Sequence, residues 1–266
     1  MLKARIITAL FLVAGLLGVL FLAPPTVAAI AFGLIAVLAA WEWAGLMKID
    51  AAGRVLYAGV IVISCLAAWD RMAAAFTGLW WLSAVFWLAL APLWLWRRWP
   101  LAANDFGGYA VGWILIVPTW AAMVGLHGRS PWLLLAAMAL VWVADIAAYF
   151  TGRALGRRKL APAISPGKTW EGAAGAVVAV LIYGAIVAVV GGRVPAATML
   201  LPAGIALILL TAVSIIGDLF ESLMKRQAGV KDSSQLLPGH GGVLDRIDSL
   251  TATLPLVALA MLWTGS

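Results

Sequence analysis

Uncharged apolar runs, each about long enough to cross a bilayer, recur along the whole chain. A helix needs about 20 mostly apolar residues to span the hydrocarbon core. Because these runs are continuous rather than alternating, they favour transmembrane helices over a β-barrel. The sequence therefore predicts an all-α, polytopic integral membrane protein with about nine transmembrane helices. Their predicted ranges are 6–23, 26–43, 55–69, 75–96, 108–126, 132–150, 172–191, 196–217 and 250–264.

The composition excludes a water-soluble globular protein. Soluble domains contain about 25% charged residues, whereas this chain contains 11% charged and 65% hydrophobic residues. The single cysteine, Cys65, lies in an apolar run and cannot form a disulfide within the chain, so we interpret it as a packed hydrophobic residue. The 15 tryptophans lie mostly near the ends of the predicted helices, which is typical of the aromatic belts at membrane interfaces.

Basic residues are divided unequally between the two sides of the predicted membrane protein. With the N-terminus in the cytoplasm, the cytoplasmic side carries 15 of the 18 Lys and Arg residues, and the opposite side carries 3, namely Arg71, Arg129 and Arg193. Cytoplasmic loops are enriched in Lys and Arg. The asymmetry therefore predicts a cytoplasmic N-terminus, an external C-terminus and a multi-pass protein of the inner (plasma) membrane.

The first 29 residues also allow another interpretation, a cleaved signal peptide. Lys3 and Arg5 precede an apolar run, and the small residues of the stretch 27–29 could form a cleavage site. However, the run is about as long as a full span, and its removal would break the predicted helix count or move the C-terminus to the other side. We therefore favour a retained first span.

Polar residues gather in two loops in the second half of the chain. We divide the chain into residues 1–130, with about five spans, and residues 131–266, which carry both loops and no separate soluble domain. The first loop contains SPGKTWEG at 165–172, and the second ends with KDSSQLLPGHGGVLDRID at 231–248. Anionic lipids explain basic residues beside a membrane, but they do not explain the acidic ones.

Acidic residues at membrane depth need a compensating partner. Asp145 falls within the range 132–150, and Asp218 falls at the end of the range 196–217. A carboxylate at this depth costs a few kcal/mol unless a cation, a partner or a water-filled cavity compensates it. For Asp145 alone, an ion pair with a neighbouring arginine explains the position equally well.

The second loop combines three kinds of residue that suit a nucleotide. If the flanking helices extend into it, Asp218 lies on a helical face with Ser222 and Lys225, and Asp245 shares a face with Asp248. Carboxylates on two such faces can hold a divalent metal. The glycines of the stretch 239–242 let backbone amides approach phosphate oxygens, and the surrounding basic residues can neutralise phosphate charge.

The stretch 222–248 resembles the signature of the phosphatidate cytidylyltransferases, also called CDP-diacylglycerol synthases. The resemblance is carried by SLMKR at 222–226, KD at 231–232 and HGGVLDRID at 240–248. It extends backward through the stretch 217–221 and the SPGKTWEG element, so it covers roughly the C-terminal half. One departure is Gly167, where many members carry lysine, and it puts one phosphate contact in doubt.

The resemblance implies a membrane enzyme that transfers CMP from CTP to phosphatidate, giving CDP-diacylglycerol and pyrophosphate, with Mg²⁺ as cofactor and a second cation as a further option. It implies Asp218 and Asp245 as first metal ligands, with Asp145 and Asp248 as further candidates. The implied catalytic residues are Asp218, Asp245, Lys225, Arg226, Lys231, Arg246 and His240. The implied substrate-binding residues are Ser165, Lys168, Thr169, Glu171, Ser222, Asp232, Gly241 and Gly242.

The expected partners are CTP, phosphatidate and the lipid bilayer, with a homodimer suggested by the resemblance and no nucleic acid. The nucleophile would be a phosphate monoester, which is already ionised at neutral pH because its second pKa is about 6. No general base is then needed, so we interpret His240 as a hydrogen-bond donor to phosphate rather than a base. His127 lies on the far side beside Arg129 and is expected to be a bystander.

Two other functions remain open from the sequence. A CTP-dependent lipid kinase of a related superfamily would use a similar site, but it would release CDP instead of pyrophosphate. A transporter would place acids along an ion path, usually in both of two repeated halves. Here the polar residues are confined to one face of the C-terminal half, and this distribution favours an enzyme.

Overall fold

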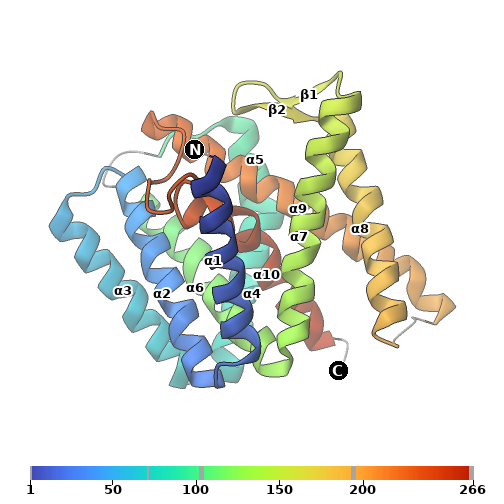
Figure 1. Cartoon of the computed structure of the whole chain (residues 1–266). Coiled ribbons are helices and arrows are strands. Elements are labelled where there is room, and N and C mark those ends of the chain that lie inside the picture. The colour runs from blue at the N-terminus through green and yellow to red at the C-terminus, as the bar shows by residue number, and fades with distance from the viewer. Residues whose placement is uncertain (1, 71, 102–104, 193–195, 264–266) are drawn as a thin grey trace.

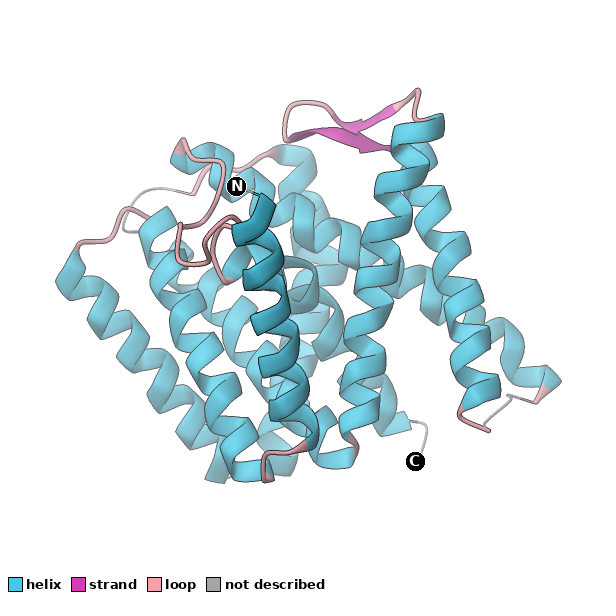
Figure 2. Ribbon diagram, viewed as in Figure 1, coloured by secondary structure: helices cyan, strands magenta, loops and turns pink. Residues whose placement is uncertain are grey.

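Helices form most of the chain in a computed structural model that describes residues 2–70, 72–101, 105–192 and 196–263 (Figures 1 and 2). Arg71, Arg193 and the end of the predicted range 250–264 lie outside the described residues. The helices are α1 (Leu2–Phe21), α2 (Pro25–Leu46), α3 (Ala51–Asp70), α4 (Met72–Val85), α5 (Ala91–Arg97), α6 (Phe106–Arg129), α7 (Pro131–Leu155), α8 (Trp170–Val190), α9 (Ala197–Ala228) and α10 (Leu244–Trp263).

The prediction of an all-α polytopic membrane protein is confirmed. Within the described residues, seven helices are long and apolar enough to cross a membrane. The helix α1 contributes a shorter apolar segment, Ile6–Phe21, and α10 begins with the charged residues Asp245, Arg246 and Asp248. Every predicted range overlaps a helix, but the number of nine spans stays a prediction.

The fourth predicted range is interrupted rather than a regular helix. Between α4 and α5, the π-helical turn η1 (Phe86–Leu90) widens the helix, and the Ala91 amide donates to the Phe86 carbonyl. Pro92 follows at the start of α5. Proline cannot donate a backbone hydrogen bond, and single π-turns are a common way to accommodate such an irregularity within a helix.

A short hairpin was not predicted from the sequence. The strands β1 (Lys159–Ala161) and β2 (Ser165–Thr169) pair antiparallel, with Lys159 opposite Thr169 and Ala161 opposite Ser165. The hairpin lies at one end of the helical bundle, between α7 and α8 (Figure 2). Its strands are too short and too polar to show the alternation that identifies a strand, yet they position the SPGKT sequence of the first polar loop.

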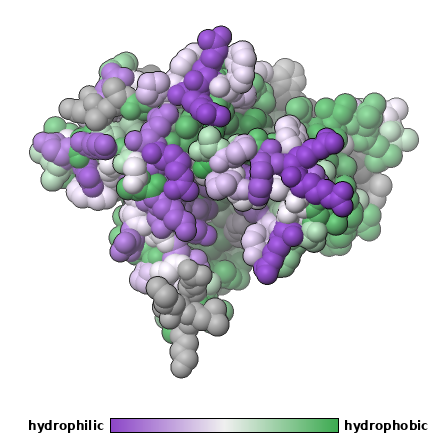
Figure 3. Space-filling view, turned by 90° about the horizontal axis from the view of Figure 1, so that it is seen from above, coloured by the Kyte–Doolittle hydropathy of each residue, from purple (hydrophilic) through white to green (hydrophobic). Residues whose placement is uncertain are grey.

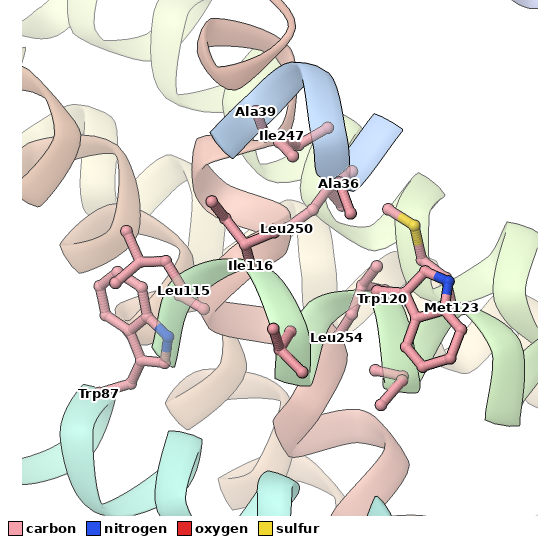
Figure 4. Packing of buried hydrophobic residues seen from close by; sticks show 14 of the residues in the cluster. Ala36, Ala39, Trp87, Leu115, Ile116, Trp120, Met123, Ile247, Leu250 and Leu254 are labelled. Carbon is pink, nitrogen blue, oxygen red and sulfur yellow. The ribbon is translucent and has the colours of Figure 1, made fainter. Parts of the chain in front are cut away.

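The core of the bundle is built on α6 and α10. Figure 4 shows Leu115 and Ile116 of α6 packed among Leu250 and Leu254 of α10, with Ala36 of α2 nearby, and these side chains are buried. Contact between lipid-embedded helices depends on close packing more than on the hydrophobic effect. The two helices therefore form a rigid support for the polar residues at the start of α10.

The helix α8 and the first part of α9 lie at the side of the bundle, and the second half of α9 runs into it (Figure 1). In α8, Val178, Ile182 and Ile186 follow one another at intervals of four residues, and each is more than half exposed. Exposed aliphatic residues along one helical face are suited to contact with lipid acyl chains. This surface fits the predicted bilayer environment.

The polar residues gather at the end of the bundle that carries the hairpin and the start of α1. Figure 3 views this end directly and shows hydrophilic residues spread over it. At the opposite end, the Arg129 side chain donates to the Met261 carbonyl near the end of α10. The predicted separation of Arg129 from the basic residues of the polar loops is thus present in the fold.

This arrangement leads to a topology experiment. With an odd number of spans and the N-terminus in the cytoplasm, we expect a reporter fused after Ser266 to lie outside the cytoplasm and one inserted in the loop 225–246 to lie inside it. Alkaline phosphatase and green fluorescent protein fusions would report the two sides. Finding both positions on the same side would disprove the nine-span topology.

Candidate functional site

A pocket of about 680 Å³ opens at the polar end of the bundle, between α7, the hairpin, α8, α9, the stretch 229–243 and the start of α10. This volume is in the range of small-molecule binding sites. The structure brings ten of the predicted site residues to its walls, and it adds Arg153 and Lys159, which the sequence did not single out. The ten are Asp145, Ser165, Lys168, Thr169, Asp218, Lys225, Asp232, Asp245, Arg246 and Asp248.

One ion pair joins the two polar loops across the pocket. The Lys168 Nζ of β2 lies 2.6 Å from the Asp218 Oδ2 of α9, and both side chains are partly exposed to the pocket. The Ser222 hydroxyl, one helical turn farther along α9, donates to Asp218 Oδ1. Lys168 and Asp218 therefore balance each other in the structure, and either could instead face a ligand of opposite charge.

A second ion pair joins α9 to α10. The Lys225 Nζ lies 2.5 Å from Asp245 Oδ1 and 3.4 Å from Glu221 Oε1. Asp245 Oδ2 accepts hydrogen bonds from the Ser233 amide, the Ser233 hydroxyl and the Gly242 amide. Both oxygens of this carboxylate are thus engaged by the protein itself.

These contacts determine the electrostatics of Asp245, which lies at the start of α10 and ahead of the predicted span 250–264. Burial alone would raise the pKa of its carboxyl group. The hydrogen bonds from Lys225 and from two backbone amides outweigh burial and hold the pKa below its ordinary value. The group is therefore a carboxylate at neutral pH.

Three further acids have fewer partners. Asp145 of α7 and Asp248 of α10 both line the pocket, and Asp248 Oδ1 accepts a hydrogen bond from the Ser249 amide. Behind them, the Glu221 side chain is 2% exposed, and its Oε1 lies 3.4 Å from the Lys225 Nζ, but neither carboxylate oxygen has a hydrogen-bond partner in the described part of the chain. Buried acids of this kind need a nearby cation or a proton.

The residues are of the type that a hard divalent cation requires, but they do not form a complete cage. No group of three or more His, Cys, Asp or Glu residues within the described ranges has the geometry to hold a metal ion. Asp145, Asp218 and Asp248 present carboxylates to one pocket, as the oxygen chemistry of Mg²⁺ demands. The expected sharing of an ion between Asp218 and Asp245 stays a prediction. Lys225, the Ser233 amide and hydroxyl and the Gly242 amide already contact the Asp245 carboxylate, which leaves it less capacity for an ion.

The first polar loop is held by local hydrogen bonds. Thr169 precedes α8, and its hydroxyl accepts from the Gly172 amide as a helix cap. The Glu171 carboxylate accepts from the amides of Arg157 and Arg158, so it fixes the turn before β1 and does not line the pocket. Gly167 lines the pocket at the position where many members of the family carry lysine. An added Cβ there would meet open space, so the fold has room for a side chain at this position.

The remaining predicted site residues also lie away from the pocket walls. Ser222 contacts Asp218, Arg226 and Lys231 are exposed, and His240 is half-buried with its amide donating to the Leu237 carbonyl. Gly241 has a φ of +80°, and a Cβ there would meet the Asp245 carboxylate. The glycines therefore act through the shape of the loop around Asp245.

Besides Arg153 and Lys159, the sequence analysis missed Glu42 of α2. Its side chain is 3% exposed, and its carboxylate contacts the loop before α10. An acid within an apolar range was the available signal, the same signal that singled out Asp145. The sequence did not connect Glu42 with the site, because its hydrogen-bond partners lie about 200 positions farther along the chain.

The sequence is similar to known enzymes along its whole length. The profile of the cytidylyltransferase family matches residues 3–264. A phosphatidate cytidylyltransferase of Pseudomonas aeruginosa is 44% identical over an alignment that covers 100% of this chain and 98% of the relative. That of Haemophilus influenzae is 37% identical, with 96% of each chain covered. That of Bacillus subtilis is 44% identical over 45% of this chain and 43% of its own.

Proposed function

Because this chain belongs to the cytidylyltransferase family and has phosphatidate cytidylyltransferase activity, we propose that its polar pocket is where the phosphate of phosphatidate attacks CTP. The oxygen of the lipid phosphate forms a bond to the α-phosphorus, and the bond from that phosphorus to the β-phosphate bridging oxygen breaks. CDP-diacylglycerol and pyrophosphate are the products. The chain is a membrane protein, and its bacterial relatives indicate the inner membrane.

The observation that carries this proposal is the alternation of acidic and basic side chains around one pocket. The basic side chains that line it are Arg153, Lys159, Lys168, Lys225 and Arg246. A triphosphate and a lipid phosphate together bring several negative charges, and lysine and arginine can neutralise them through charge-assisted hydrogen bonds. Such a surface suits two phosphorylated substrates held side by side.

The reaction needs positioning and charge neutralisation more than proton transfer. The attacking phosphate oxygen is already ionised, so no residue has to remove a proton from it. Negative charge grows on the departing pyrophosphate, and preorganised cations can stabilise it in the transition state. We assign this role to the basic side chains of the pocket, with the lysines acting as mobile point charges and the arginines as two-pronged donors.

We further propose that Asp145, Asp218 and Asp248 hold a divalent cation such as Mg²⁺ when substrates are bound, with Asp245 as the alternative ligand. A cation there would offset phosphate charge and polarise the phosphoryl oxygens. The support is the donor set, which consists of carboxylate oxygens facing one pocket.

We propose that the pocket faces the cytoplasm, since CTP is available there and the polar end carries most of the basic residues. The apolar faces of α8 and α9 beside it would let phosphatidate approach from the bilayer. A homodimer remains a proposal from family resemblance. Neither of these proposals affects the chemistry assigned to the pocket.

The activity and its metal requirement can be tested together. We expect the purified protein, incubated with CTP labelled in the cytosine ring and phosphatidate in mixed micelles, to form labelled CDP-diacylglycerol and pyrophosphate in equal amounts. A chelator should abolish product formation and added Mg²⁺ should restore it. Release of CDP with transfer of the γ-phosphate would instead identify a CTP-dependent lipid kinase.

Replacing His240 by glutamine should leave turnover within about tenfold of the wild-type rate. His240 lies outside the pocket walls and its position is fixed by the backbone of the stretch 237–241, whereas a residue required for proton transfer typically contributes about 10²–10⁴-fold. Initial rates with both substrates saturating would measure the effect. A loss of about a thousandfold without loss of folded protein would restore His240 as a proton-transfer group.

A further inference from the structure

We propose that Glu42 of α2 is a positioning residue for the active site. Its carboxylate fixes the loop between α9 and α10, and this loop in turn positions Asp245, which pairs with Lys225. Glu42 lies about two hundred residues before this loop, within the first half of the chain, whose role the family motif does not address. The inference rests on the proposed function of the pocket, but its structural part can be tested without catalysis.

Glu42 receives four hydrogen bonds from a single segment. Its Oε1 accepts from the Ser234 hydroxyl at 2.6 Å and the Val243 amide at 2.9 Å. Its Oε2 accepts from the Ser233 hydroxyl at 2.9 Å and the Leu244 amide at 2.8 Å. The Ser234 hydroxyl and the two amides donate to Glu42 alone, whereas the Ser233 hydroxyl has one proton and shares it between Glu42 Oε2 and Asp245 Oδ2. A buried carboxylate is stable only when its oxygens are satisfied in this way.

Two of these donors belong to the start of α10. The first amides of a helix have no partner within the helix and carry a partial positive charge, so they favour an acceptor with negative charge. Val243 and Leu244 occupy this position, and Glu42 supplies the acceptor from a different helix. The contact therefore fixes where α10 begins, and Asp245 is the next residue along.

The network continues from Glu42 into the active site. The Ser233 hydroxyl lies 2.9 Å from Glu42 Oε2 and also 2.9 Å from Asp245 Oδ2, and Asp245 in turn binds Lys225. One serine thus joins the carboxylate of α2 to the ion pair of the pocket. A shift of Glu42 would move Ser233 and, through it, the carboxylate that holds Lys225.

The loop leaves no room for an alternative arrangement. A Cβ on Gly242 would collide with the Ser233 hydroxyl and the Glu42 carboxylate, so only glycine allows this close approach. The family motif contains Gly242, but the reason for a glycine here lies in α2. Glu42 and Gly242 therefore form one structural unit across the two halves of the chain.

Replacing Glu42 by glutamine tests the proposal, since glutamine has almost the same shape. Each carboxylate oxygen faces one hydroxyl and one backbone amide, so the glutamine NH₂ group meets an amide donor in either orientation. We expect turnover to fall about 10- to 100-fold, as for residues that orient catalytic groups, with little change in the KM of either substrate. We also expect faster hydrogen exchange at Val243 and Leu244 in detergent without substrates, and unchanged exchange in α8.

A control and a second pair of variants complete the experiment. The Asp50 carboxylate accepts from the Gly53 amide at the start of α3 and, among the residues that the structure describes, makes no hydrogen bond to the loop, so Asp50→Asn should leave turnover and loop exchange unchanged. Ser233→Ala should cost more activity than Ser234→Ala, because only Ser233 also contacts Asp245. Combining Ser233→Ala with Glu42→Gln should cost less than the sum of the two effects, since both act on Asp245.

Each outcome decides a separate question. Turnover of Glu42→Gln within about twofold of wild type, or unchanged exchange at Val243 and Leu244, would overturn the positioning role. Equal effects of the two serine variants would also overturn it, even if Glu42→Gln failed to fold. If the wild-type protein formed no product from CTP and phosphatidate, the proposed function would be wrong. Faster hydrogen exchange of the loop in Glu42→Gln would still support the structural role of Glu42.

Discussion

Replacing Asp218 by asparagine is expected to lower turnover at least about a hundredfold and to raise the magnesium concentration needed for half-maximal rate. Asp218 faces the pocket, pairs with Lys168 at 2.6 Å and accepts a hydrogen bond from Ser222. Asparagine keeps the size of the side chain but removes the charge. The pocket would lose a cation ligand, and Lys168 would lose the partner that orients it.

The Asp218→Asn protein should still insert and fold. The change removes the desolvation penalty of a carboxylate near the bilayer but also removes the partner of Lys168, and both side chains are partly exposed, so stability without ligands should stay close to that of the wild type. Thermal unfolding in detergent would check this. Asp70→Asn, at the exposed end of α3, is a matched control that should change neither rate nor magnesium dependence. Near-normal turnover of Asp218→Asn with unchanged magnesium dependence would contradict the metal site proposed here.

The sequence predicted the helices well because hydropathy is a local property. Each of the predicted ranges overlaps a helix of the structure. The same is true of the helical extensions into the second loop, since α9 continues to Ala228 and α10 begins at Leu244. Consequently, Asp218 and Lys225 were correctly placed on α9, and Asp245 and Asp248 on α10.

The orientation of neighbouring residues on a helix was harder to predict. Lys225 and Arg226 were both assigned to phosphate, but consecutive helical residues point about 100° apart because a turn contains about 3.6 residues. Lys225 faces the pocket and Arg226 is exposed. The motif contains both residues, and only the packing of α9 decides which of them faces the site.

Contacts between distant segments could not be derived from the motif. The hydrogen bonds of Glu42 join residues separated by up to 202 positions, and nothing in the spacing of the second loop points to α2. Glu171 gives a shorter example, because its carboxylate binds the amides of Arg157 and Arg158 instead of facing the pocket. Both carboxylates accept hydrogen bonds from the backbone amides of a loop, and these contacts form only in the folded structure.

Replacing Asp245 by asparagine is the second change expected to lower turnover at least about a hundredfold, but for a different reason from Asp218. Its carboxylate binds Lys225 on one oxygen and accepts from Ser233 and the Gly242 amide on the other. An asparagine NH₂ group would face either the lysine ammonium or the two backbone amides. In both orientations donors meet donors, and the loop must shift.

The magnesium dependence of the Asp245→Asn protein separates the two roles open to this residue. If Asp245 acts by holding Lys225 and the loop, the remaining activity should need the same magnesium concentration as the wild type. If it is a metal ligand, the requirement should rise as in Asp218→Asn. The four donors already on Asp245 favour the first result, whereas Asp218, with one cation and one hydroxyl, has more capacity for an ion. Initial rates of both variants over a magnesium series therefore show whether Asp245 positions the loop or binds the cation. An equal rise in the magnesium requirement of both variants would identify Asp245 as a metal ligand.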